Sequence, residues 1–254
     1  CADYRLIDPG DRIALGVSGG KDSVLLMHAM RLYRYFSPVP FTFLAVHLQL
    51  GFPGTDASPL KAYASENGVP FHVVPTDIAA VVFDIRKEKN PCSLCAKLRR
   101  GALNDHAKRL GCNKVALAHH MDDALETFFL SLFYEGRVYT LSPRSYLDRT
   151  GITLIRPMLY LPEKHIASAV RRLSLPVAQN PCPADGRTKR QEMKALLGRI
   201  AAEIPGAKER MLHALQNTEA YGLWDRAKPR MNCSCRSMNT RSGGTMVSSA
   251  PAIT

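Results

Sequence analysis

The chain has 254 residues, 46% of them hydrophobic, and its 34 Lys and Arg against 22 Asp and Glu give a formal charge of +12. This length allows one sizeable core and a smaller appendage, and the positive charge favours a polyanionic partner. No apolar run approaches the ~20 residues of a membrane span, and the first residues lack a signal peptide's apolar core, so we expect a cytoplasmic protein with no membrane partner.

Apolar runs rich in β-branched residues alternate with helical patterns, which is typical of βαβ units and a parallel sheet. We therefore predict an α/β fold with a parallel five-stranded sheet flanked by helices. The predicted strands are 12–17, 41–48, 71–74, 114–118 and 153–156. Helices are predicted directly after Asp22 and at 59–67, 93–110, 123–134 and 163–173. At the start of the helix at 123–134, Asp123 and Glu126 make a capping-box pattern.

The C-terminal part has a different composition. Helical patterns at 190–200 and 207–221 lie in a basic stretch, 164–230, with 13 Lys and Arg against 6 Asp and Glu. This stretch is expected to meet an RNA backbone, or to be only a solvated surface. Residues 231–254 are polar and without period, which predicts disorder. We divide the chain into an α/β domain at 1–180, a cysteine loop with a small helical extension at 181–230, and a tail at 231–254.

The first predicted strand ends in Ser18, Gly19 and Gly20, at the edge where open α/β sheets bind ligands. Glycines allow close approach of the backbone, and the new helix offers unpaired N–H groups to an anion. Lys21 adds positive charge, whereas Asp22 would repel phosphate directly and is better suited to a magnesium ion that bridges phosphates. Walker and dinucleotide-binding glycine patterns are both absent.

A second polar group leaves the carboxyl end of the fourth predicted strand, on the same edge as the glycine turn. It comprises His119, His120, Asp122 and Asp123. The adjacent carboxylates could orient magnesium. The alternative is that Asp123 caps the following helix and the histidines are satisfied core groups.

Seven cysteines in a reducing cytoplasm favour metal ligands, reactive groups or buried hydrophobes over disulfides. Cys92 and Cys95 form one CxxC just before a predicted helix, and Cys182, in a proline-rich loop, could supply a third thiolate. Three cysteines suit an iron-sulfur cluster with one open iron; structural zinc, redox thiols and buried cysteines stay open. Cys112 is expected in the core, and Cys233 with Cys235 could bind metal in the tail.

Several motifs carry a resemblance over residues 10 to 200. SGGKDS at 18–23 resembles the pyrophosphatase loop of N-type ATP pyrophosphatases, the PP-loop superfamily. The motifs that follow resemble, in order, the landmarks of tRNA 2-thiocytidine synthetases: CSLCAKLRRG at 92–101, AHHMDDALE at 118–126, FYEG at 133–136, IRP at 155–157 and NPC at 180–182.

The resemblance implies a Rossmann-like fold of the adenine nucleotide alpha hydrolase type and an ATP-dependent tRNA sulfurtransferase. ATP would adenylate the C2 carbonyl oxygen of an anticodon-loop cytidine, with release of pyrophosphate, and sulfur would then replace AMP. The implied sites are Ser18, Gly19, Gly20, Lys21, Asp22, Ser23, His47 and His119 for ATP, Asp22 and Asp123 for Mg²⁺, Cys92, Cys95 and Cys182 for a [4Fe-4S] cluster, and Lys21, Asp22, Arg99 and Asp123 for catalysis.

Three basic residues follow the CxxC: Lys97, Arg99 and Arg100. They could bind phosphate, or only form a solvated helix face. Relatives often carry a second CxxC at the third-cysteine loop, but Asp185 stands at that position here. A sulfur relay through that thiol would therefore be altered.

The implied partners are tRNA, a sulfur donor such as a cysteine desulfurase or inorganic sulfide, and a second copy in a homodimer. Three alternatives stay open: 2-thiouridine formation, lysidine formation, and a non-catalytic RNA-binding or iron-sensing module. The presence of Lys21, Asp22 and Asp123 argues against the last of these.

Overall fold

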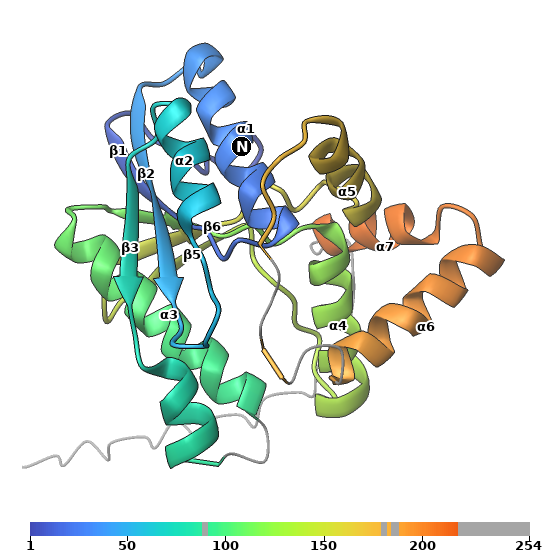
Figure 1. Ribbon diagram of the computed structural model, residues 1–254. Coiled ribbons are helices and arrows are strands. Elements are labelled where there is room, and N and C mark those ends of the chain that lie inside the picture. The colour runs from blue at the N-terminus through green and yellow to red at the C-terminus, as the bar shows by residue number, and fades with distance from the viewer. Residues whose placement is uncertain (88–90, 179–181, 184–187, 218–254) are drawn as a thin grey trace, which may run out of the picture. The chain divides into compact units, whose positions relative to one another are not determined.

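The computed structural model describes residues 1–87, 91–178, 182–183 and 188–217 (Figure 1). The predicted tail with Cys233 and Cys235 lies outside these residues, as do Asp185 and the boundary expected between residues 180 and 181. Among the described helices, none has the length and apolar character needed to span a membrane.

A six-stranded sheet with the order β3-β2-β1-β4-β6-β5 runs through the described chain. Its strands are β1 (Asp11–Gly16), β2 (Phe41–Gln49), β3 (Phe71–Pro75), β4 (Lys114–Ala116), β5 (Arg144–Leu147) and β6 (Ile152–Ile155). The five predicted strands are present and parallel, which confirms the α/β prediction.

The prediction of five strands missed β5, which pairs antiparallel with β6 at the sheet edge. Its sequence, RSYL, has four residues that alternate between exposed and half-buried positions. A short edge strand of this kind lacks the continuous apolar run that marks a buried parallel strand.

Helices cover both faces of the sheet, because alternate strand residues point to opposite sides. Ile13 and Leu15 face one core, which α1 (Lys21–Phe36), α2 (Ser58–Glu66) and α5 (Glu163–Arg172) complete. Ala14 faces the other core, where α3 (Pro91–Arg109) contributes Leu103 and Ala107. A short π-helix, η1 (Ala80–Ile85), which was not predicted, precedes α3.

The remaining helices, α4 (Met121–Glu135), α6 (Lys189–Glu203) and α7 (Ala207–Gln216), share a separate small core. Its buried residues are Met121, Leu125, Met193 and Leu197. In Figure 1 the arrowheads of β2 and β3 point toward the end of the sheet beyond which α4 extends, whereas α1 runs back along the strands. The start of α4 therefore lies at the carboxyl edge of the sheet, and its end lies farther out on that side.

Candidate functional site

The Ser23 hydroxyl fixes the conformation of the turn after β1 through three backbone hydrogen bonds. Ser23 Oγ accepts hydrogen bonds from the N–H groups of Ser18 and Gly19, at 3.1 and 3.2 Å, and donates to the carbonyl of Gly20 at 2.9 Å. Gly19 has φ +92°, and a Cβ there would lie 3.0 Å from Ala178 Cβ. Gly20 starts α1 with no side-chain cap, so the first N–H groups of this helix are left for an anion.

Lys21 lies between two carboxylates at the start of α1. Its Nζ is 2.9 Å from Asp22 Oδ1 and 2.9 Å from Glu163 Oε1 on α5. Burial would lower the pKa of Lys21, but the hydrogen bonds and charges of Asp22 and Glu163 outweigh it and raise that pKa. Lys21 therefore keeps its positive charge beside the glycine turn.

Asp22 and Asp123, the two residues predicted to hold Mg²⁺, both lie near the His120 imidazole. His120 Nε2 lies 3.8 Å from Asp22 Oδ1 and 3.4 Å from Asp123 Oδ2. The predicted capping box of Asp123 and Glu126 was wrong, because His120 is the N-cap and exchanges hydrogen bonds with Asp123. Glu126 is buried and accepts a hydrogen bond from Arg190 Nη1 at 3.1 Å.

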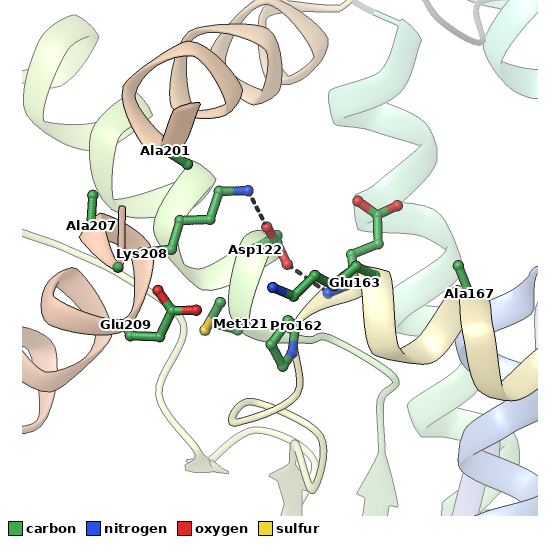
Figure 2. Close-up of a pocket in the computed structure, with 11 residues that line it drawn as sticks. Met121, Asp122, Pro162, Glu163, Ala167, Ala201, Ala207, Lys208 and Glu209 are labelled. Atoms are coloured by element: carbon green, nitrogen blue, oxygen red, sulfur yellow. Dashed lines mark hydrogen bonds and ion pairs between the residues drawn. The ribbon is translucent and has the colours of Figure 1, made fainter. Parts of the chain in front are cut away.

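Asp122 is adjacent to Asp123 but has its hydrogen-bond partners outside residues 18–23, which we call the phosphate turn. Its Oδ2 also lies 3.8 Å from His120 Nδ1. Its carboxylate accepts hydrogen bonds from the Glu163 N–H at 2.7 Å and from Lys208 Nζ at 2.6 Å, both drawn in Figure 2. It lines a pocket of about 410 Å³ between the starts of α4, α5 and α7. None of the residues predicted for ATP, iron or catalysis lines this pocket.

Of the two histidines predicted to bind ATP, His47 is buried and His119 is half-buried. His119 Nδ1 accepts a hydrogen bond from Arg156 Nε at 3.2 Å, and burial, with Arg156, lowers the pKa of His119 to about 4. His47 Nδ1 donates to the carbonyl of Val17 at 2.8 Å, which ties the end of β2 to the end of β1. Both imidazoles therefore lie beside the carboxyl edge of the sheet.

Cys92 and Cys95 lie within the first turns of α3, whereas the sequence pattern placed them just before the helix. Residues three apart lie on the same face of a helix. Burial raises the pKa of the Cys95 thiol, Arg99 opposes this through its charge and a hydrogen bond, and the charges of Cys182 and Cys92 raise that pKa further. The structure thus brings Cys182 close enough to act on Cys95, about ninety positions away in the sequence.

These thiols do not form a closed ligand set. In the described part of the chain, no three His, Cys, Asp or Glu side chains are arranged to hold a metal ion. The type of donor still fits an iron-sulfur cluster, because such clusters are held by cysteine thiolates. The three thiols, with Arg99 beside them, are the group that fits this chemistry.

A backbone hydrogen bond connects the thiols to the phosphate turn. Ala178 N donates to the carbonyl of Gly19 at 3.0 Å. Cys182 follows four residues later, and four extended residues span at most about 14 Å. The Cα atom of Cys182 therefore lies within about 14 Å of the Cα atom of Ala178, the residue that is hydrogen-bonded to Gly19.

Sequence reasoning missed the residues that connect the phosphate turn to the other helices. Glu163 pairs with both Lys21 and Lys194, at 2.9 and 2.6 Å. Burial would raise the pKa of Glu163, but the hydrogen bonds from Lys194 and Lys21 lower it to about 2. Pro162 and Glu163 predict a helix start, but no local pattern indicates that this start lies beside Lys21.

A parallel sheet with a glycine turn, an uncapped helix start and a charged lysine at its carboxyl edge defines a nucleotide-binding α/β protein of the ATP-pyrophosphatase class. The sequence matches the PP-loop domain family over residues 4–199. It is 39% identical to the tRNA-cytidine(32) 2-sulfurtransferase of Geobacter metallireducens over 91% of each chain, and 41% identical to that of Methylococcus capsulatus over 88% of this chain and 78% of the relative. The chain belongs to the tRNA-cytidine 2-sulfurtransferase family of PP-loop proteins.

The fold also resembles a solved structure. The U34-tRNA thiolase NcsA from Methanococcus maripaludis, determined with its [4Fe-4S] cluster, superimposes with a TM-score of 0.68 at 23% identity, covering 85% of this chain and 74% of that one. This similarity supports the fold.

Proposed function

We propose that this protein is an ATP-dependent tRNA sulfurtransferase that converts a cytidine of the anticodon loop to 2-thiocytidine. The curated relatives that match about nine tenths of the chain are named for this activity. The observation that carries the proposal is the hydrogen bond from Ala178 to Gly19, because it positions Ala178, four residues before Cys182, beside the phosphate turn. Nucleotide activation and sulfur transfer then take place at one edge of the sheet.

In the first step, the C2 oxygen of cytidine forms a bond to the α-phosphorus of ATP, and pyrophosphate leaves. The turn from Ser18 to Ser23 would hold the phosphates with backbone N–H groups at the start of α1. Lys21 would stabilise the negative charge that develops on pyrophosphate. Asp22 and Asp123, on either side of His120, would hold Mg²⁺ through carboxylate oxygens.

In the second step, sulfide as HS⁻ bonds to C2, the C2–O bond breaks, AMP leaves with the oxygen, and the sulfur loses its proton to give the thiocarbonyl. Cys92, Cys95 and Cys182 would hold a [4Fe-4S] cluster, which would supply an open iron for the incoming sulfur. Arg99 favours the thiolate form of Cys95 through its positive charge and hydrogen bond. His47 and His119, neighbours of the turn, would line the nucleotide site.

The remaining partners follow from this chemistry. Inorganic sulfide would supply the sulfur directly, whereas a cysteine desulfurase would supply it as a persulfide, which a cellular thiol would first reduce by two electrons to sulfide. A reducing cytoplasm would keep the cysteines available as ligands. We further propose that the enzyme works as a homodimer, as its family suggests.

Nucleoside mass spectrometry tests the proposal. Purified tRNA is incubated under anaerobic conditions with the protein, ATP, Mg²⁺ and sulfide. We expect 2-thiocytidine with the wild-type protein and none with Cys182→Ala. Cys112→Ala is the matched control, because Cys112 is 4% exposed within the core packed by α3, and it should thiolate as the wild type does.

Each other product selects a different function. Normal thiolation by Cys182→Ala would remove that residue from the mechanism. Formation of 2-thiouridine would show that the substrate base is uridine. Formation of lysidine by a protein that contains no iron or sulfide would show that the reaction uses no cluster. If tRNA and a cluster bind but neither pyrophosphate nor modified nucleoside appears, the protein is an RNA-binding or iron-sensing module.

A further inference from the structure

An exposed group of aromatic and apolar side chains lies where α4 ends. Residues 132–139 are exposed without interruption. Phe133, Tyr134 and Tyr139 have 56%, 58% and 50% of their surfaces accessible, and Val138 has 65%. A run of large exposed side chains that is rimmed by charged residues is typical of an interaction site.

Two of these rings have a cation above them. Arg137 Cζ lies 5.1 Å from the centre of the Tyr139 ring, and Lys189 Nζ lies 5.8 Å from that of Tyr134. Cations at these distances are attracted to the ring face. We call Phe133, Tyr134, Arg137, Tyr139 and Lys189 the α4 platform.

The turn that carries the platform has a defined conformation. Gly136 ends α4 with φ +61°, and the Ser131 hydroxyl donates to the carbonyl of Arg137 at 2.9 Å. Thr140 Oγ1 donates to the carbonyl of Ala124 at 2.6 Å, which returns the chain along the helix. The rings are therefore presented on a fixed backbone, which reduces the entropy that a ligand would lose on binding.

Two acidic residues pair with the cations of the platform. Glu135 pairs with Arg137 at 2.6 Å, and Glu192 pairs with Lys189 at 2.8 Å. All four side chains are more than half exposed. Surface pairs of this kind are weak, and both cations can turn toward a phosphate.

The platform is on the same side of the sheet as the phosphate turn. α4 starts at the carboxyl edge with His120 as its cap and extends away from the sheet on that side (Figure 1). Its 15 residues correspond to about 22 Å. A polymer engaged at the turn and the thiols can therefore also reach the platform.

A second exposed aromatic pair provides a comparison. Tyr35 and Phe36, at the end of α1, are 72% and 70% exposed, and Arg34 lies 5.5 Å from the Tyr35 ring centre. Because α1 runs back along the strands, this pair lies at the amino edge of the sheet (Figure 1). It has the same chemistry on the wrong side for the reaction.

We propose that the α4 platform binds unpaired bases of an RNA loop by stacking on Tyr134, Tyr139 and Phe133, while Arg137 and Lys189 contact the flanking phosphates. This rests on the proposed function, since the loop is that of the tRNA substrate. Unstacked loop bases are recognised in this way because every base presents a π-face to an aromatic ring. The formal charge of +12 gives the complementary sign for such a polyanion.

Fluorescence anisotropy with the full chain tests the platform, in the absence of ATP and sulfide. The probes are an RNA hairpin with an unpaired loop and a blunt duplex of the same stem. We expect Tyr134→Ala and Tyr139→Ala each to weaken hairpin binding about tenfold, which corresponds to ~1.4 kcal/mol. Duplex binding should be unchanged. Tyr134→Phe should bind the hairpin as the wild type does, because the ring is kept.

Tyr35→Ala is the matched control, and its hairpin affinity should stay within about twofold of the wild type. Unchanged hairpin binding by both platform variants, or equal losses with the duplex, would overturn the proposal. Sedimentation of the proteins without RNA provides the other outcome: if wild type is a dimer and Tyr134→Ala a monomer, the platform is an interface between copies.

The assay separates this inference from the proposed function. If the wild-type protein thiolates tRNA but its platform variants bind the hairpin normally, only the platform assignment fails. If the platform variants lose loop binding and the wild type forms no thiolated nucleoside, only the proposed reaction fails.

Discussion

Asp122 and Asp123 are adjacent in the sequence, yet α4 directs their carboxylates to different surroundings. Asp123 bonds back to the His120 N–H at 3.0 Å and stays beside Asp22 at the phosphate turn. Asp122 is 6% exposed and is engaged by Lys208 and by the Glu163 N–H. Our proposal therefore assigns Mg²⁺ to Asp123, whereas Asp122 links the starts of α5 and α7.

His119 gives a prediction about pH at the residue scale. Burial lowers its pKa to about 4 in the folded protein, against 6.5 for an ordinary histidine. Between these values the unfolded chain binds more protons than the folded one, so stability falls as the pH falls. We expect His119→Gln to lose less unfolding free energy than the wild type between pH 7 and pH 5.

Urea unfolding at both pH values measures this difference. Glu163, with its pKa lowered to about 2, acts only below an ordinary glutamate's 4.5 and does not interfere. The exposed His165 on α5 provides the control variant, His165→Gln, which should follow the wild type. Equal losses of unfolding free energy in His119→Gln and the wild type would mean that folding does not lower the pKa of His119.

At the scale of elements, the phosphate turn depends on its close packing against the segment at Ala178. The Gly19 carbonyl accepts a hydrogen bond from the Ala178 N–H. The Ala178 side chain also lies close to Gly19, so that a Cβ atom added at Gly19 would be 3.0 Å from Ala178 Cβ. The turn is therefore shaped from both sides, by the Ser23 hydroxyl within and by the segment at Ala178 outside.

Gly19→Ala tests this arrangement. An alanine would have to adopt φ +92° and would place its Cβ 3.0 Å from Ala178, so it meets both strain, about 1–3 kcal/mol, and a close contact. Gly54→Ala separates the two effects, because Gly54 has φ +75° with nothing within 4 Å. We expect both variants to lose stability in urea unfolding, Gly19→Ala more.

ATP binding, measured by calorimetry, distinguishes the variants further. Gly19→Ala should bind ATP more weakly, and Gly54→Ala should bind it as the wild type does. ATP affinity that is unaffected by Gly19→Ala would show that the turn tolerates displacement from Ala178.

The five parallel strands and the helices could be predicted because their signals are local: apolar runs, glycine turns and helical periodicity. The position of Lys21 and Asp22 at the end of β1 follows from the same signals. The ion pair of Glu163 with Lys21 and the electrostatic effect of Cys182 on Cys95 join distant segments, and no pattern within either segment indicates them. His120 was missed as a cap because the preference for Asp at caps favoured Asp123.

At the scale of the molecule, the proposed RNA binding combines charged contacts with stacking on aromatic rings. Phosphate contacts give affinity that falls with salt, whereas stacking on neutral rings does not release counterions. Arg100 is exposed on α3, one residue beyond Arg99 and five beyond Cys95. Arg172 is exposed at the other end of α5 from Glu163.

Salt titration of hairpin binding separates the two contributions. For the wild type we expect log K to fall linearly with log salt concentration. Arg100→Gln should weaken binding and reduce the slope by about 1, because one phosphate contact is lost. Arg172→Gln should change neither the affinity nor the slope.

Tyr134→Ala should lower the affinity at every salt concentration and leave the slope unchanged, because the tyrosine ring that is lost carries no charge. If Tyr134→Ala changed the slope and Arg100→Gln did not, the platform would act by positioning cations, and the RNA backbone would lie along α4 and α6 and not along α3.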